Sequence, residues 1–356
     1  MANEEVPAVS VIIPIYNAEK YIEQCLKSLL NQTLKNFEVI VIDDCSTDNS
    51  AKIVEKFMDL QDWQERFSFA QISPNTGRPG IPRNIAIKHA KGKYIYFLDS
   101  DDFLDENVLE EFYNVAEKFN ADVVHAEKCF KYEEIDGKFE NRLHFLESTS
   151  ATQQPTLETS DIAKRITSFL GLTCTPMIWS KFFRREFLIE NDITFPKITV
   201  AEDFIFTFQC ICLAKKYVRV PFVGYHYRKY DNSTTKKPGT VELSSRNLIE
   251  GVDFLDKFMQ SQKFFIENPN YQYSVIDFFN QIFSDLIFKY MFFQLNMDTE
   301  DTYDFYLKNI FALNPQKNIP LTAYLFVSTN IYKMLVNQQA EEIAQLKKII
   351  AELKGD

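Results

Sequence analysis

Residues 93–102, KYIYFLDSDD, combine a buried-strand pattern with a group of carboxylates. The apolar run Tyr94–Leu98 is followed by three aspartates within four residues. This pattern is typical of a strand whose carboxyl end opens on a ligand site. Carboxylates this close repel one another, and a divalent cation such as Mg²⁺ or Mn²⁺ relieves the repulsion. The alternative is a strand followed by a helix that is capped by Asp102 or Asp105.

Strand-like and helical patterns alternate on both sides of this stretch. Because near-continuously apolar strands alternate with helices, we expect a parallel sheet covered on both faces, with ligands at its carboxyl edge. The predicted strands are 9–16, 37–43, 67–72, 94–98, 121–126 and 218–227. The predicted helices are one after Asn17, one ending at Met58, and those at 83–90, 105–119, 162–170 and 201–215. A hairpin around Asp136-Gly137 is predicted within 128–145.

The texture of the sequence changes after the polar segment Asp231–Gly239, where strand-like alternation ends. Helices are predicted at 255–265, 273–295 and 302–313. We therefore expect an α/β domain at 1–230, a smaller all-helical domain at 231–334 and a terminal helix at 335–356.

The terminal helix has a short heptad pattern. Val336, Ile343 and Ile350 share one position, and Leu346 and Leu353 share the other. This pattern favours a parallel two-stranded coiled coil and hence a homodimer. The alternative is a terminal helix that packs on its own domain, because fewer than three heptads are marginal alone.

The composition excludes several classes of protein. A formal net charge of −11 argues against a nucleic-acid binder, which needs a basic face. The N-terminal stretch MANEEVPAVSV lacks the basic region of a signal peptide, and no stretch reaches the ~18 apolar residues of a membrane span. The six cysteines have no metal-site spacing and are expected to be reduced thiols. We expect a cytoplasmic protein, with peripheral contact at the inner face of a membrane allowed.

Four motifs occur in order at predicted strand ends and helix starts. They are VSVIIPIYNAEKYIEQCLKSLLNQT, FEVIVIDDCSTDNS, NTGRPGIPRNIAIKHAKGKYIYFLDSDD and AEDFIF. Over Val9–Arg228 the chain therefore resembles the family 2 nucleotide-sugar glycosyltransferases with the GT-A fold, and particularly the bacterial wall-teichoic-acid enzymes. The resemblance implies a mixed, mainly parallel sheet flanked by helices, followed by the smaller helical domain.

The resemblance implies a donor site for a UDP-sugar. Asp44 corresponds to the acid that accepts from the uracil base, with a helix cap as the alternative role. Arg83 corresponds to the arginine beside the base and phosphates, with a surface salt bridge as the alternative. Asn17 has a helix N-cap as its alternative. The implied nucleotide-binding residues are Pro14, Tyr16, Asn17, Asp44, Asn75, Arg83, Asp99 and Ser100.

Asp99-Ser100-Asp101 corresponds to the DxD motif of the family. It implies that Asp101, with Asp99, holds Mn²⁺ or Mg²⁺ on the diphosphate, while Asp102 is structural. His226 corresponds to a position where some relatives place a metal or phosphate ligand, and a structural histidine is the alternative.

The AED motif supplies the implied base. Asp203 would take the proton of the acceptor hydroxyl, with Glu202 as the competing candidate and helix capping as the alternative for either acid. Trp179, Lys181 and Arg184 are expected on the acceptor side, with a place in the core as the alternative for Trp179. Without a QxxRW motif or membrane spans, single-sugar transfer is favoured over polymerisation.

The expected function is inverting, metal-dependent transfer of a sugar from a UDP-sugar to a hydroxyl of a bacterial surface-glycan acceptor, such as lipopolysaccharide, capsule or teichoic acid. The acceptor would be a glycan or glycolipid. The competing hypothesis is a catalytically silent, oligomerising relative. A nucleotidyltransferase or a dinucleotide-dependent oxidoreductase would need a glycine-rich loop after the first strand, where this chain has YNAEKY.

Overall fold

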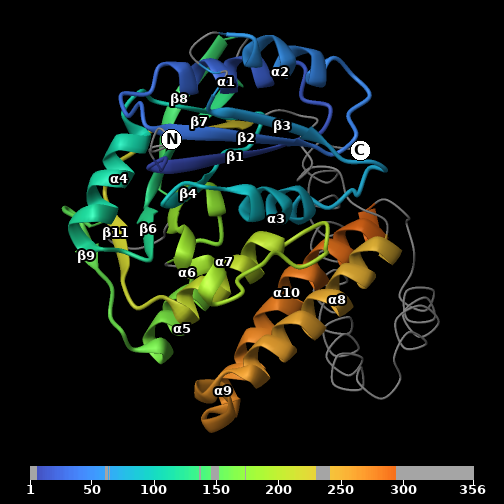
Figure 1. Cartoon of the computed structure of the whole chain (residues 1–356). Helices are drawn as coiled ribbons and strands as arrows, with labels where there is room; N and C mark the ends of the chain where they lie inside the picture. The colour runs from blue at the N-terminus through green and yellow to red at the C-terminus, as the bar shows by residue number, and fades with distance from the viewer. Residues whose placement is uncertain are drawn as a thin grey trace, which may run out of the picture. The chain divides into compact units, whose positions relative to one another are not determined.

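The structure is a computed structural model that describes residues 6–60, 63, 65–135, 138–145, 152–172, 174–229 and 241–293. Within this part of the chain, two sheets and the helices around them place the polar residues singled out above (Figure 1).

The larger sheet has eight strands in the order β3-β2-β1-β4-β10-β6-β11-β9. The first four are mutually parallel. Strand β10 then runs antiparallel between β4 and β6, β11 is parallel to β6, and β9 is antiparallel at the edge. The strands are β1 Val9–Ile15, β2 Phe37–Asp43, β3 Phe67–Gln71, β4 Tyr94–Phe97, β6 Val123–Ala126, β9 Thr156–Leu157, β10 Lys181–Arg184 and β11 Tyr217–Val220.

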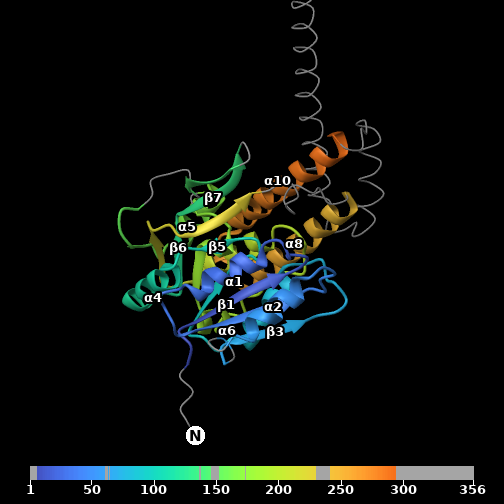
Figure 2. The ribbon, with the colours of Figure 1, turned by 90° about the horizontal axis from the view of Figure 1, so that it is seen from above.

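Helices cover the sheet on both faces. Helices α1 (Ile22–Leu30) and α2 (Ser50–Met58) lie on one face of β1–β3, in both views of the ribbon (Figures 1 and 2). Helix α3 (Gly80–His89) lies on the opposite face (Figure 1). Strands β1, β2 and β4 are buried along almost their whole length, as expected for parallel strands between two helical layers, whereas the edge strand β3 is partly exposed.

The remaining helices of the α/β part lie between residues 108 and 213. Helix α4 packs its apolar stripe against the sheet, and Phe112 of this helix stacks on Phe182 of β10 at a centroid distance of 5.4 Å. Helices α5 and α7 pack on each other through Phe169 and Phe204. The bounds are α4 Val108–Phe119, α5 Ile162–Leu170, α6 Arg185–Glu190 and α7 Glu202–Leu213, with a short 3-10 helix η1 at Ile178–Ser180.

A second sheet of four strands has the order β5-β12-β7-β8, with bounds β5 Phe103–Leu104, β7 Lys128–Ile135, β8 Lys138–Phe145 and β12 Tyr225–Lys229. The antiparallel pair β7-β8 confirms the predicted hairpin, although its turn at 136–137 lies outside the described residues. The single strand predicted at 218–227 is wrong. It divides into β11 of the large sheet and β12 of the small sheet, because Pro221 and Gly224 interrupt the run between them.

The C-terminal part of the described chain is helical, with α8 Val241–Ser261, α9 Lys263–Glu267 and α10 Pro269–Phe293. The chain forms two compact units, 1–237 with 250–275, and 238–249 with 276–356. The predicted helix at 302–313 and the predicted coiled coil lie outside the described residues. None of the helices in the described ranges has the length and apolarity needed to cross a membrane.

Candidate active site

Asp44 lies at the carboxyl end of β2 and organises the loop that follows β3. Its two carboxylate oxygens accept from the backbone N–H and the hydroxyl of Thr76, both at 2.9 Å. Asn75 donates its side-chain amide to the Asp44 carbonyl at 2.6 Å. Helix α2 begins at Ser50 with Asn49 as its N-cap residue, so the helix-cap alternative for Asp44 is wrong. Gly77 turns this loop with a φ of +60°, a conformation that glycine adopts without strain.

The exit of β1 is joined to the exit of β2 through Asn17. Its backbone is left-handed, with a φ of 50°. Its side-chain oxygen accepts from the Thr47 N–H at 2.8 Å, and its own N–H donates to the Ser46 hydroxyl at 2.9 Å. Helix α1 begins only at Ile22, so Asn17 is not its N-cap. The next residue before it in the sequence, Tyr16, exposes 52% of its surface.

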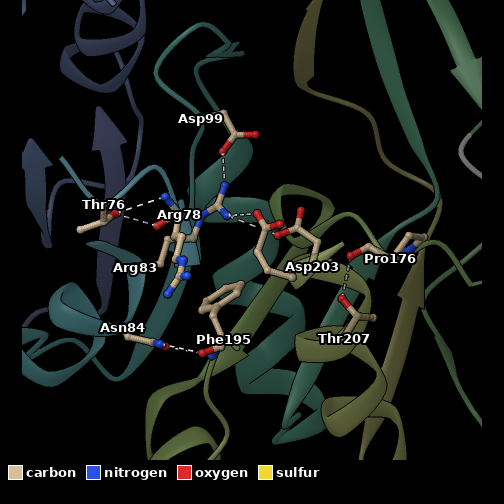
Figure 3. Close-up of polar contacts among 10 residues, drawn as sticks. Thr76, Arg78, Arg83, Asn84, Asp99, Pro176, Phe195, Asp203 and Thr207 are labelled. Atoms are coloured by element: carbon tan, nitrogen blue, oxygen red, sulfur yellow. Dashed lines mark hydrogen bonds and ion pairs between the residues drawn. The ribbon is translucent and has the colours of Figure 1, made fainter. Parts of the chain in front are cut away.

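Arg83 of α3 connects two acidic segments that are distant in the sequence (Figure 3). One terminal nitrogen lies 2.9 Å from Asp99 at the end of β4. The other lies 2.9 Å from Glu202 and 3.4 Å from Asp203 at the start of α7. Arg83 is buried, so the alternative of a surface salt bridge is wrong.

These contacts change the protonation chemistry of the site. Burial, together with the charges of Glu202 and Asp99, raises the pKa of Asp203, although Arg83 opposes the shift. Burial likewise raises the pKa of Glu202 against the opposing effect of Arg83. The Asp203 side chain keeps 27% of its surface exposed, so water limits the rise there, whereas Glu202 keeps only 9%. Neither acid caps α7, whose N-cap position is Ala201 without a side-chain bond.

The other two aspartates after β4 have different surroundings. Asp102 is buried and accepts from the Tyr225 hydroxyl and, at 2.7 Å, from the Arg228 N–H. These bonds attach the DxD turn to β12, which is a structural role. The pKa of Asp102 is raised by burial and by the charges of Asp101 and Asp99. Asp101 and Ser100 are partly exposed. The backbone carbonyl of Asp101 accepts from Arg228 Nε at 2.7 Å.

The carboxylate oxygens at this turn are of the type that a hard divalent cation binds, but they are few. Carboxylate oxygens of Asp99 and Asp101 are the ligands that Mg²⁺ and Mn²⁺ prefer, and their negative charges already act on buried Asp102. Among the described residues, however, no three His, Cys, Asp or Glu side chains gather as a metal site. The described residues therefore supply the carboxylates of Asp99 and Asp101 at this turn without a third side chain of these types gathered with them.

His226, the third expected metal ligand, lies on β12 and is enclosed by protein groups. Its ring stacks between Phe103 and Phe130, with centroid distances of 4.3 and 4.9 Å. Nε2 lies 2.8 Å from Asp105, and Nδ1 lies 3.0 Å from Asn141. Since both ring nitrogens contact protein groups, this geometry favours a structural histidine over a metal ligand.

The residues expected on the acceptor side do not form a basic surface. Lys181 is fully buried on β10, and its ammonium donates to the carbonyls of Thr175 and Met177 at 2.6 and 2.8 Å. Arg184 forms an ion pair with buried Asp122. Trp179 is buried and stacks on Tyr225 at 4.3 Å. The expectation for Lys181 is wrong because its side chain is buried in the sheet, and Arg184, with 23% of its side-chain surface exposed, is engaged by Asp122 and Glu186.

Two contributors to the site were not predicted. Thr76 holds Asp44, and Phe195 lies 5.5 Å from the Arg83 guanidinium carbon. Asn84 fixes Phe195 by bonding both its backbone N–H and its carbonyl at 2.9 Å. The PRN motif contains Asn84, but nothing in the sequence pairs this residue with a segment 111 positions away.

Comparison with known proteins agrees with this geometry. Residues 10–187 match the family model described as Glycosyl transferase family 2. The poly(ribitol-phosphate) beta-N-acetylglucosaminyltransferase TarS of Staphylococcus aureus is 32% identical over 250 residues, which are 69% of this chain and 38% of TarS. A poly(ribitol-phosphate) beta-glucosyltransferase of Bacillus spizizenii is 35% identical over 222 residues, 62% of this chain and 32% of that protein. The chain thus spans about a third of the length of these relatives.

The crystal structure of S. aureus TarS 1–349 in complex with UDP-GlcNAc has a similar fold. It superposes with a TM-score of 0.60 and 24% sequence identity, over 94% of this chain and 92% of that chain. The expected GT-A architecture, a mixed and mainly parallel sheet with helices and a helical C-terminal region, is thereby confirmed.

Proposed function

Because this chain belongs to glycosyl transferase family 2, we propose that it transfers a sugar from a UDP-sugar to a hydroxyl group of a surface-glycan acceptor. One observation carries the proposal. Asp99 at the end of β4 and Asp203 at the start of α7 contact the same arginine, although 104 residues separate them (203 − 99). The proposed donor-binding group and the proposed base thus contact one side chain, from the end of β4 and the start of α7.

The donor end lies between Tyr16, Asn17, Asp44 and Asn75. The exposed ring of Tyr16 offers a stacking face for a base, and the buried acid Asp44 offers an acceptor beside it. Pro14 lies in β1, one residue before the last residue of the strand, Ile15. Asp99 and Ser100 follow on the neighbouring strand end, where the ribose and diphosphate would lie. UDP as the nucleotide is supported by the UDP-GlcNAc complex of the similar TarS structure and by the acid at position 44.

Asp101, with Asp99, is proposed to hold Mn²⁺ or Mg²⁺ when the nucleotide is present. The protein ligands are fewer than three in the described residues, so diphosphate oxygens would complete the set. A bound cation would neutralise charge on the departing diphosphate.

Asp203 is the proposed base, in preference to Glu202. A base must meet the acceptor hydroxyl, and the Asp203 side chain is three times as exposed as that of Glu202, 27% against 9%. As the acceptor oxygen attacks the sugar carbon, Asp203 takes its proton, and the diphosphate leaves from the opposite face. One displacement of this kind inverts the anomeric carbon and needs no sugar-enzyme bond.

The acceptor class rests on the relatives, whose names specify ribitol-phosphate polymers. We extend it to bacterial surface glycans in general, either polymers or glycolipids. A cytoplasmic location at the inner face of a membrane and a homodimer through the C-terminal helices complete the proposal on sequence grounds alone.

The first experiment is a calorimetric titration of UDP into the protein with and without Mn²⁺, repeated with dTDP. We expect metal-dependent binding that prefers UDP. UDP-GlcNAc and UDP-glucose are then tested as donors with a ribitol-phosphate polymer as acceptor. An absence of binding to both nucleotides would favour the silent relative, whereas sugar transfer would exclude it.

The matched variant is Asp203→Asn, which keeps the shape of the side chain and removes its basicity. We expect transfer to fall by about 10²–10⁴-fold, the usual contribution of a general base, with unchanged UDP binding. Glu202→Gln serves as the comparison, because a base at Glu202 would make the loss of transfer in this variant at least as large as in Asp203→Asn. Asp203 loses its role if the Asn variant retains turnover.

A further inference from the structure

We propose that Arg83 is a positioning residue that holds the two neighbouring acids Glu202 and Asp203 at a fixed distance from Asp99. We propose further that it does not bind the donor phosphates. This inference rests on the function proposed above and deepens it. It departs from the phosphate pairing that the family resemblance implies for this arginine.

The contacts of Arg83 leave its two terminal nitrogens engaged. One donates to Asp99 and the other to Glu202 and Asp203, and only 6% of its side-chain surface is exposed. A guanidinium that binds phosphate bidentately presents two N–H groups to the same anion. Here each terminal nitrogen faces a different carboxylate segment, and Nε is buried, so a phosphate would reach the guanidinium only if the groups that cover it moved.

The surroundings of Arg83 fix its orientation. The ring of Phe195 lies 5.5 Å from its guanidinium carbon, and Phe195 is held by Asn84, the next residue on α3. Nε has no hydrogen-bond partner within the described structure. Arg83 therefore gains its polar contacts at its tip alone, where they join the end of β4 to the start of α7.

This arrangement has a consequence for catalysis. Asp99 belongs to the donor end of the site and Asp203 to the acceptor end, and Arg83 sets the spacing between the two. Displacement of a reacting group by about 1 Å can cost on the order of 10²-fold in rate. Loss of Arg83 should therefore lower kcat while the affinity for UDP is kept.

The test separates kcat from nucleotide affinity. Arg83→Lys keeps the charge but offers one ammonium, which cannot reach both segments as a planar guanidinium does. We expect kcat to fall about 100-fold, whereas the Kd for UDP with Mn²⁺ changes by less than tenfold. Equal losses in kcat/KM and in UDP affinity would identify a phosphate ligand and overturn the inference, as would an unchanged kcat.

A second variant tests the same inference even if the Arg83→Lys protein does not fold. Glu202→Gln is isosteric, and Glu202 accepts from Arg83 at 2.9 Å. We expect a lower kcat with unchanged UDP affinity, and a double variant with Arg83→Lys that is no slower than the slower single variant, because the residues act as one unit. Additive losses in kcat would overturn the inference.

Arg219→Lys is the matched control. Arg219 also joins two acids, Glu127 at 2.8 Å and Glu158, and the Glu127 side chain is fully buried. This arginine lies on β11, outside the proposed site, so its replacement should lower the melting temperature and leave kcat unchanged. If the unmodified chain neither binds UDP nor transfers sugar, the proposed function itself fails. If the unmodified chain is active and only the Arg83 outcomes differ, the inference alone fails.

Discussion

Asp203 and Glu202 are neighbours in the sequence, yet their carboxylates have different surroundings. Both lie in the first turn of α7, where the N-terminal end of the helix favours negative charge. Burial works against this effect and raises the pKa of both groups. The more exposed Asp203 can still meet an acceptor, while Glu202 is covered and faces Arg83. Environment, and not residue type, separates their roles.

The raised pKa of Asp203 predicts a pH dependence. A base must be deprotonated, so the rate rises with pH as the proton leaves. Because burial raises this pKa above that of an ordinary aspartate, we expect the ascending limb of kcat/KM against pH to lie well above pH 4. A pH–rate profile with saturating Mn²⁺ measures this limb. A profile that is flat from pH 5 upward would contradict the assignment.

Asp101→Asn tests the proposed cation ligand. The substitution keeps the side-chain shape and removes the charge that a hard cation prefers. We expect UDP affinity in the presence of Mn²⁺ to fall by at least the ~10–100-fold that loss of an outer-shell partner costs. Without metal, UDP affinity should equal that of the unmodified protein, as calorimetry would show. Retained metal dependence would exclude Asp101 as a ligand.

At the scale of the elements, the parallel half of the large sheet was predictable from the sequence. Strand β2 has the predicted bounds, and β1, β3 and β4 each end one residue early. The apolar runs of β1, β2 and β4 are nearly continuous because both faces are covered, whereas β3 is a partly exposed edge strand. Strand β10 was missed because its first residue, Lys181, is fully buried, and lysine is a residue type that patterns place at the surface.

For the candidate site, the sequence indicated individual residues but not the contacts between them. Asp44, Asp99 and Asp203 were identified from motifs, because each lies where a strand ends or a helix begins. The contacts of Arg83 with Glu202 and Asp203 were not predicted, because more than a hundred residues separate Arg83 from these two acids in the sequence. Sequence periodicity reports the local face of a helix, and it carries no information about which distant segment packs against that face.

Helix α3 approaches Phe195 and Pro196 closely at Gly80. A Cβ added at Gly80 would lie 2.7 Å from Phe195 Cβ and 3.1 Å from the Pro196 carbonyl. Gly80→Ala should therefore destabilise the protein by about 1–3 kcal/mol, as overpacking does. It should also lower kcat, since α3 carries Arg83.

Denaturant unfolding and a transfer assay measure the two effects. Gly171→Ala is the comparison, because its added Cβ approaches no atom closer than 3.2 Å. If the Gly80 variant is as stable and as fast as the unmodified protein, the close approach of α3 does not position the site.

For the whole molecule, the net charge of −11 bears on the acceptor. A ribitol-phosphate polymer is anionic, so long-range repulsion should slow its encounter with this protein at low salt. Raising the ionic strength to about 0.15 M shortens the Debye length to about 8 Å. We expect the KM for such a polymer to fall with salt, whereas the KM for an uncharged glycan stays constant. A salt series with both acceptors distinguishes the two classes, and a KM for the polymer that rises with salt would contradict the repulsion.

The assembly of the molecule is predicted from residues 335–356, which lie outside the described part. A chain shortened to end at Leu335 should become monomeric if the heptad pattern forms a coiled coil. Light scattering over a range of concentrations measures the mass. Unchanged assembly in the shortened chain would refute a role for the coil.

The stacking of Trp179 on Tyr225 has an optical consequence. The chain contains two tryptophans, Trp63 and Trp179. Trp63 packs between Phe37 and Phe67, whereas the tyrosine under Trp179 donates its hydroxyl to Asp102 in the DxD turn. In a Trp63→Phe chain, all indole fluorescence would therefore arise one side chain away from the acidic turn. The protein thus carries its own emission signal at the place where the nucleotide and its cation are proposed to bind.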